Sequence, residues 1–248
     1  AMVTPARENL DYYSENGQLK TERLNVRSFK FYADGALGSR GACLIEPYSD
    51  EPEHAGMLLN DTEYLKQMAQ KVFDMGFQMN THCIGDSANR LMLDIYGDIL
   101  KGTNDKRWRI EHAQVIHPSD FEKFAQYNII PSVQATHATS DMYWAEARLN
   151  PERVKGAYAY KQLLEQNGMI ALGTDFPVEN IKPLNTFYAA VSRKDSQGFP
   201  EGGYQIENAL TRKEALRGMT IWAAISNFEE NETNKFLVYT RIRASSTI

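Results

Sequence analysis

The chain has 248 residues, of which 42% are hydrophobic and 24% are charged, and these fractions are ordinary for a soluble globular protein. Its length suits one large domain or two small ones. A net charge of -5 argues against nucleic acid or an anionic membrane as the main partner, and we find neither a membrane-spanning apolar run nor a signal-peptide pattern. The two cysteines form no CxxC pair, so a reducing, cytoplasmic location is expected.

Short apolar strands alternate with helices along most of the chain. Residues 1–27 are polar and are expected to form an irregular N-terminal segment. Strands are predicted at 28–32, 77–82, 108–112, 129–134 and 169–174. Helices are predicted to begin after Asp61 as N-cap and to cover 86–100, 118–128, 159–167, 183–193 and 211–226, with Gly168 as a C-cap. This alternation favours a mostly parallel sheet, either an open α/β sheet or part of a barrel, over 28–228.

The remaining residues, 229–248, form an atypical tail without a helical stripe or turn signals. We expect the tail to be a truncated or frameshifted end, and 235–244 is a candidate for one more strand.

A lysine in the first predicted strand needs an explanation. Strand side chains alternate between the two faces, so Phe29 and Phe31 point one way and Lys30 points the other. An unpaired buried ammonium is costly. Lys30 could pair with a carboxylate such as Asp34, form a Schiff base as an amine of lowered pKa, or react with CO₂ to give a carbamate that binds metal. The sequence pattern leaves these three interpretations open.

Each predicted strand ends in residues typical of metal binding or acid–base chemistry. In chain order they are Lys30 and Asp34, His82, Glu111 and His112, Gln134 and His137, and Asp175. In parallel α/β folds the functional groups gather at the carboxyl ends of the strands. Two imidazoles and a carboxylate, from His82, His112 and Asp175, would suit Zn²⁺ or a similar divalent ion.

Three polar side chains near the strand ends have simpler explanations. Glu111 is expected to point away from His112 and to pair with a surface cation. His117 precedes Pro118 and fits the entry to a helix. The loop 198–204 is glycine-rich and fits either a lid or, as we favour, a plain surface connection.

Six motifs together resemble a known family. They are FKFYADGALGSRGA, THCIGDSANR, RIEHAQ, PSVQATH, LGTDFPVENIKPL and LTRKEALRGMTIWAA, and they span about residues 26–228. In kind and order they resemble the amidohydrolase superfamily, and within it the amidohydrolase-3 group of metal-dependent hydrolases, which includes N-substituted formamide deformylases. The resemblance implies an α/β fold that forms part of a TIM (β/α)₈ barrel, with strands four to eight and their helices.

The resemblance also implies a metal centre. Lys30 matches the strand-four lysine, which is carbamylated in the family and bridges two metals. His82 and His112 match the histidines that bind one of these metals. Asp175 matches the aspartate that is both a metal ligand and the catalytic general base. The expected cofactor is therefore a divalent metal, with zinc as the first candidate.

Around this centre the resemblance implies a substrate site. Gln134 and His137 match a loop that the family places over the substrate, and the loop Gly35–Arg40 would shape the mouth. We assign Asp34 and Arg40 to substrate binding with them. The expected reaction is hydrolysis of a carbon–nitrogen bond in a small amide-type substrate by metal-activated water, which yields a carboxylate, or formate, and an amine.

The chain departs from the family pattern in one respect that bears on activity. It contains no His-x-His, the motif that ends the family's first barrel strand and binds the other metal. We therefore expect strands one to three to be absent, one metal or none to be bound, and the open barrel edges to favour a homo-oligomer.

Two alternatives follow from this departure. The first is an inactive, degenerate barrel fragment that binds a metal or another ligand. The second is a Schiff-base aldolase-type barrel that uses Lys30, and it is disfavoured because it leaves His82, His112 and Asp175 without a role.

Overall fold

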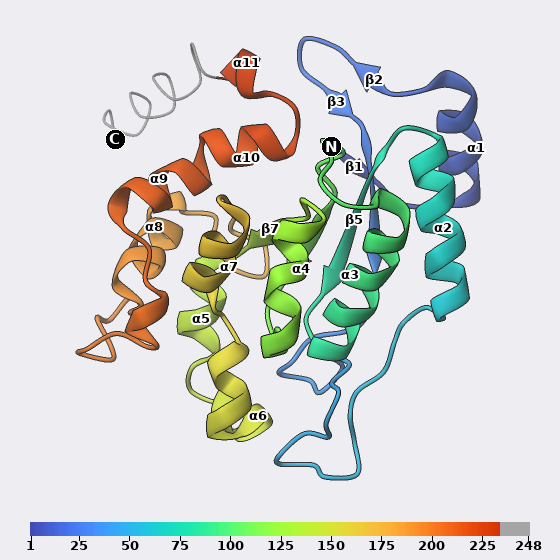
Figure 1. Cartoon of the computed structure of the whole chain (residues 1–248). Helices are drawn as coiled ribbons and strands as arrows, with labels where there is room; N and C mark the ends of the chain where they lie inside the picture. Colours follow the sequence, from blue (N-terminus) through green and yellow to red (C-terminus); the bar gives the residue numbers. More distant parts are fainter. Residues whose placement is uncertain (234–248) are drawn as a thin grey trace.

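A curved parallel sheet with helices along one face forms the centre of the molecule. The computed structural model describes residues 1–233, so the predicted strand 235–244 lies outside the described residues. The sheet has six strands in the order β1-β4-β5-β6-β7-β8, and all five neighbouring pairs are parallel. The strands are β1 Met2–Val3, β4 Ser28–Tyr32, β5 Gln78–Cys83, β6 Arg109–His112, β7 Ile130–Val133 and β8 Ala171–Leu172. Figure 1 shows this arrangement.

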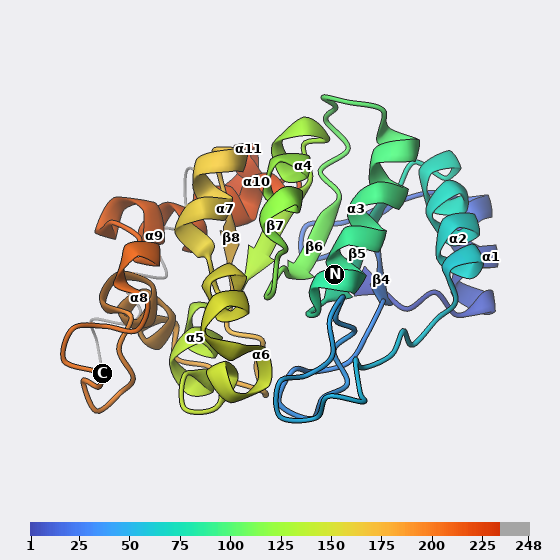
Figure 2. The ribbon, with the colours of Figure 1, turned by 60° about the horizontal axis from the view of Figure 1, so that its bottom comes forward.

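The helices lie outside the sheet in chain order. They are α1 Arg7–Asn16, α2 Thr62–Asp74, α3 Asp86–Leu100, α4 Phe121–Gln126, α5 Ala135–Asp141, α6 Ala145–Arg153, α7 Tyr160–Asn167, α8 Pro183–Ser192, α9 Arg212–Met219, α10 Ile221–Ser226 and α11 Glu230–Thr233. Figure 2 shows α2, α3, α4 and α7 as a row beside the strands. The predicted fold class, part of a TIM barrel, is confirmed by this parallel sheet with its outer helices.

The predicted helix ends follow from capping chemistry. The Asp61 carboxylate accepts the amide hydrogen of Tyr64 at 2.7 Å, which fixes the start of α2. A capping box between Thr211 and Glu214 begins α9. Gly168, with a φ of 76°, ends α7 in the left-handed conformation that glycine adopts without strain.

The apolar core lies between the sheet and the helices. Phe29, Phe31, Met79 and Ile110 are 1% exposed or less and belong to one continuous cluster of buried side chains from strands and helices. Lys30 faces the other side, as the alternation along β4 predicts.

The inner face of the sheet is polar. Register pairs Lys30 with Asn80, Asn80 with Arg109, and His82 with Glu111, so these residues share one face. Arg109 donates to Glu111 Oε1 at 2.8 Å and to the carbonyl of Ser226 in α10 at 2.9 Å. Charged and amide side chains, rather than aliphatic ones, therefore fill this part of the inner face.

Two regions differ from the sequence-based expectation. The segment 1–27 is not irregular: it contains α1, a two-stranded antiparallel sheet of Leu19–Lys20 and Asn25–Val26, and β1. β1 joins the main sheet because Met2 and Val3 pair in parallel with Ser28 and Phe29. The single helix predicted over 211–226 is two helices, since Thr220 between α9 and α10 has φ −127° and ψ −92°.

None of the helices in the described range 1–233 is both long enough and apolar enough to cross a bilayer.

Candidate functional site

Three histidines gather at the carboxyl ends of the central strands. His82 lies near the end of β5, His112 is the last residue of β6, and His137 lies in α5 just after β7. The rings of His82 and His112 meet edge to face with centroids 4.5 Å apart. The ring of His137 stacks on that of His112 at 5.7 Å, with 15° between the planes. The structure thus brings together two predicted metal ligands and one predicted substrate residue.

The backbone leaves the strand conformation at two of the site residues. His112 has a φ of 74°, the following Ala113 a φ of 42°, and Asp175 a φ of 55°. Left-handed φ values are uncommon outside glycine and concentrate at functional sites. At the end of β6 the left-handed turn also breaks the two-residue alternation of side chains between the faces of the sheet. The His112 side chain is therefore not restricted to the face opposite that of Glu111.

Burial keeps all three imidazoles neutral. Desolvation, followed by the nearby Lys30 charge, lowers the pKa of His82 to about 4. Burial and the neighbouring His82 lower the pKa of His112 to about 3, and burial lowers the pKa of His137 to about 4. A neutral imidazole has a free lone pair, and it is this form that binds a metal.

His112 and His137 differ in their hydrogen bonds. His112 Nδ1 lies 2.8 Å from Gln134 Oε1. His137 Nε2 is buried and finds no hydrogen-bond partner within the described residues, although Asp175 Oδ2 lies 4.0 Å away. A buried polar atom without a partner in a native fold calls for a ligand, an ion or a water. His137 is therefore placed to meet a molecule in this site.

Lys30 approaches the same site from β4. Its Nζ lies 5.0 Å from the centroid of the Tyr32 ring, and it forms no ion pair within 4.0 Å among residues 1–233. Burial lowers the pKa of Lys30 below its ordinary value, and the carboxylate of Glu111 opposes this shift. The interpretation in which Lys30 pairs with Asp34 is not supported, because the Asp34 oxygens bind backbone amides instead.

Asp175 lies at the open side of the cluster. Its side chain is 38% exposed, so solvent or a substrate can reach it. Burial raises the pKa of Asp175, while the charge of Lys30 opposes the rise. This carboxylate thus lies close enough to His137 to exchange protons with a molecule held there.

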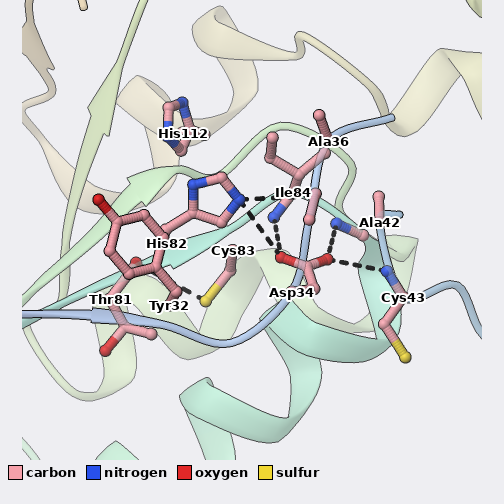
Figure 3. Close-up of polar contacts among 12 residues, drawn as sticks. Tyr32, Asp34, Ala36, Ala42, Cys43, Thr81, His82, Cys83, Ile84 and His112 are labelled. Carbon is pink, nitrogen blue, oxygen red and sulfur yellow. Dashed lines mark hydrogen bonds and ion pairs between the residues drawn. The ribbon is translucent and has the colours of Figure 1, made fainter. Parts of the chain in front are cut away.

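Asp34 is wholly buried rather than placed at a mouth. Its carboxylate accepts the amide hydrogens of Cys43 at 2.9 Å, Ile84 at 3.0 Å and Gly85 at 2.7 Å, as Figure 3 shows in part. The same figure shows His82 between Tyr32 and Asp34, with His82 Nε2 3.7 Å from Asp34 Oδ1. Burial raises the pKa of Asp34 to about 7, although the three backbone bonds oppose the rise. Asp34 braces the strand that carries His82.

Arg40 is engaged within its own loop. Its guanidinium donates to both carboxylate oxygens of Asp50, at 3.1 and 3.0 Å, and lies 3.2 Å from Glu51. Arg148 of α6 also pairs with Asp50. These bonds tie the long connection between β4 and α2 to α6 (Figure 1). Arg40 is thus not part of the histidine cluster, and the assignment of Arg40 and Asp34 to substrate binding remains a prediction.

Glu111 was expected at the surface, and that expectation is wrong. The residue is 7% exposed and bonds to Arg109, which is also 7% exposed. Burial alone would raise the pKa of Glu111, but the charges of Arg109 and Lys30 outweigh it and lower the pKa. The sequence did not place Glu111 on the inner face of the sheet. The signal was present, because the two-residue period that puts His82 on that face also puts its register partner Glu111 there.

The cluster fits a divalent metal in part. His82 and His112 offer two neutral nitrogen donors of the kind that zinc prefers. Within residues 1–233, however, no group of three or more His, Cys, Asp or Glu side chains is arranged to hold a metal ion. The two imidazoles of His82 and His112 are therefore the metal donors that the described residues bring together.

Comparison with known proteins gives consistent relatives. Residues 2–233 match the model of the Amidohydrolase family. The chain is 37% identical over 194 residues to Protein LONG AFTER FAR-RED 3 of Arabidopsis thaliana. This alignment covers 77% of this chain and 33% of that protein. It is 31% identical over 228 residues to amidohydrolase YtcJ of Bacillus subtilis, which covers 92% of this chain and 43% of that protein.

A solved structure has the same fold. An uncharacterized metal-dependent hydrolase from Pyrococcus horikoshii superposes with a TM-score of 0.81 and 31% identity, over 92% of this chain and 46% of that one. The chain thus spans less than half the length of each of these proteins. Because the family model extends over nearly all the described residues and a solved metal-dependent hydrolase shares the fold, the chain belongs to the amidohydrolase family.

Proposed function

We propose that this chain is part of a metal-dependent hydrolase that cleaves a carbon–nitrogen bond in a small amide-type substrate. The observation that carries the proposal is the pair of neutral rings of His82 and His112, 4.5 Å apart at the carboxyl ends of adjacent strands. Membership of the amidohydrolase family and the likeness to a metal-dependent hydrolase support the same reaction class.

His82 and His112 would hold the metal, and Lys30 would complete the set as a carbamate. The uncharged lysine amine adds to the carbon of CO₂ and loses one proton, which gives an anionic oxygen donor in place of an ammonium. Burial of Lys30 favours the uncharged amine that this step requires. Zinc is the first candidate because it accepts nitrogen and oxygen donors in tetrahedral sites.

The protein's own side chains would handle the protons. A divalent metal, when bound, lowers the pKa of water from about 16 toward about 7 and polarises a carbonyl. Asp175, partly exposed beside the cluster, would accept a proton from the attacking water and return it to the leaving nitrogen. His137 Nε2, which is buried and unpaired within the described residues, would hydrogen-bond the substrate. The carbon–nitrogen bond breaks, a carbon–oxygen bond forms, and a carboxylic acid and an amine result.

The second candidate is a metal- or ligand-binding barrel without catalysis. The observation that favours it is the lack of a three-residue metal set of His, Cys, Asp or Glu within residues 1–233. A third possibility, a Schiff base at Lys30, uses the same lowered lysine pKa as carbamylation does.

Elemental analysis after zinc loading and removal of free ion tests the proposal. We expect at least one zinc per wild-type chain, a loss of zinc in His112→Gln, and no loss in His117→Gln. The last variant is a matched control, since His117 lies at the start of the 3₁₀ turn before α4 and its ring bonds to Ser119.

Lys30 is tested separately with ¹³C-labelled bicarbonate. A carbamate signal in the wild type that is missing in Lys30→Met supports the proposed ligand. Zinc binding with no hydrolysis of N-substituted formamides or other small amides would favour the non-catalytic candidate. Absence of zinc from the loaded wild type would rule out the metal centre, and borohydride trapping of an aldehyde or ketone on Lys30 would then support the Schiff-base candidate.

A further inference from the structure

Gln134 makes a contact that its predicted substrate role does not explain. It follows β7, is 6% exposed, and places Oε1 2.8 Å from Nδ1 of His112. Its short bond to a candidate metal ligand indicates a different task.

The chemistry of the two groups fixes the position of one proton. A neutral imidazole carries a hydrogen on one ring nitrogen and a lone pair on the other. The amide oxygen can only accept, so a bond from Nδ1 to Gln134 Oε1 requires the hydrogen on Nδ1. The lone pair of His112 is then on Nε2. Partners of this kind commonly orient metal-binding histidines through the nitrogen that does not bind the metal.

Gln134 is itself held from outside the site. The hydroxyl of Tyr160, at the start of α7, donates to the backbone carbonyl of Gln134 at 2.9 Å. Tyr160 is 1% exposed, and the buried guanidinium of Arg193 lies 5.3 Å from its ring centroid. The backbone that carries the acceptor side chain is therefore fixed by packed side chains of α7 and the end of α8.

We propose that Gln134 is a positioning residue that holds His112 as the Nδ1–H tautomer and so presents Nε2 as the donor atom of the site. The tautomer is inferred from the contact between Nδ1 and the amide oxygen, which can only accept. Its consequence for metal affinity rests on the proposed function, and the two are measured separately.

Long-range ¹H–¹⁵N NMR of the imidazoles in metal-free protein at pH 8 tests the tautomer. His112 signals are assigned by their absence in His112→Gln. We expect a protonated Nδ1 and an unprotonated Nε2 in the wild type and in Gln134→Glu, which keeps an accepting oxygen. In Gln134→Met the Nδ1–H signature should be lost or mixed with the Nε2–H form. Gln67→Met, the same change at an exposed glutamine of α2, should match the wild type.

Metal affinity provides the second readout. Zinc competition titrations should give 10–100-fold weaker binding for Gln134→Met and near-native binding for Gln134→Glu and Gln67→Met. An Nε2–H tautomer in the wild type, or an unchanged tautomer in Gln134→Met, overturns the proposal. The wild-type spectrum decides the tautomer even if Gln134→Met does not fold. If the wild type shows Nδ1–H but binds no zinc, Gln134 still positions His112 and only the proposed metal function fails.

Discussion

The carboxylate of Asp34 accepts the amide hydrogen of Gly85 at 2.7 Å, and this bond joins the loop after β4 to the first turn of α3. The same carboxylate accepts from Ile84 and Cys43. We expect Asp34→Ala to lower the free energy of unfolding by about 3 kcal/mol, because buried amides would lose their acceptor. Guanidinium denaturation measures the change. Asp11→Ala, at a 60% exposed carboxylate, should cost far less, and equal losses in the two variants would contradict the role of Asp34 as a brace.

The buried histidines predict a pH dependence of stability. Burial, with His82 beside it, holds the pKa of His112 at about 3 in the folded state, below the value of about 6.5 in an unfolded chain. The unfolded state therefore gains the proton first, and stability present above pH 6.5 is lost on acidification. For metal-free protein, the difference in the free energy of unfolding between wild type and His112→Gln should fall by about 2 kcal/mol from pH 7 to pH 5. The reason is that pH 5 lies about 1.5 pH units below the unfolded-state pKa, and each unit corresponds to about 1.36 kcal/mol.

The matched control for this experiment is His117→Gln. Its stability should follow the wild type across the same pH range, because His117 lies at a helix start outside the cluster. Parallel pH curves for wild type and His112→Gln would show that His112 is not held neutral by the fold.

Gly85 allows a close approach of two chain segments. A Cβ at this position would lie 2.0 Å from the carbonyl oxygen of Cys43, a backbone atom that cannot move aside. We expect Gly85→Ala to lower the melting temperature by about 10 °C or more or to prevent folding, because the two segments must separate. Gly173→Ala, where nothing lies within 4 Å of the added carbon, should stay within about 2 °C of the wild type. Similar melting temperatures for both variants would contradict the packing at Gly85.

Exposed apolar side chains follow β8, which is the last strand of the sheet. Val178, Ile181 and Leu184 are 73%, 62% and 73% exposed. Exposed apolar side chains close in the chain to an edge strand favour association. We expect the chain to self-associate at micromolar concentration and Leu184→Lys to weaken the assembly, as measured by light scattering on a sizing column. Met57→Lys, at an exposed methionine of the β4–α2 connection, is the control, and a monomeric wild type would contradict the prediction.

Elements with a strong pattern were predictable from the sequence. Ser28–Tyr32 and Asp86–Leu100 have the predicted bounds, because alternation in the strand and an apolar stripe in the helix dominate their formation. Met2–Val3 was not predictable as a strand, since two residues carry no period and their pairing with Ser28 and Phe29 is decided by tertiary contacts. The break at Thr220 is equally tertiary, because the helical stripe continues through it.

Part of the candidate site was predictable for a related reason. Parallel topology requires strand ends to meet, so His82 and His112 were expected to be neighbours, and their rings lie 4.5 Å apart. The bond between His112 and Gln134 depends on a left-handed backbone at the end of β6, which no residue pattern announces. Lys30 shares the inner face of the sheet with Glu111 and forms no ion pair with Asp34 among residues 1–233, and the shared face reflects the register of three strands.

The polar inner face of the sheet has a consequence for modularity. In the described chain the continuous apolar cluster holds Phe29, Met79 and Ile110 of the outer face of the sheet. On the concave side, Arg109, Glu111 and Asn80 hydrogen-bond to one another or to the backbone. Water reaching that concave side would solvate groups that are already hydrophilic. A run of consecutive strands with its outer helices can therefore keep its apolar layer without closing into a complete barrel. Such runs are thus suited to exchange between barrels as units.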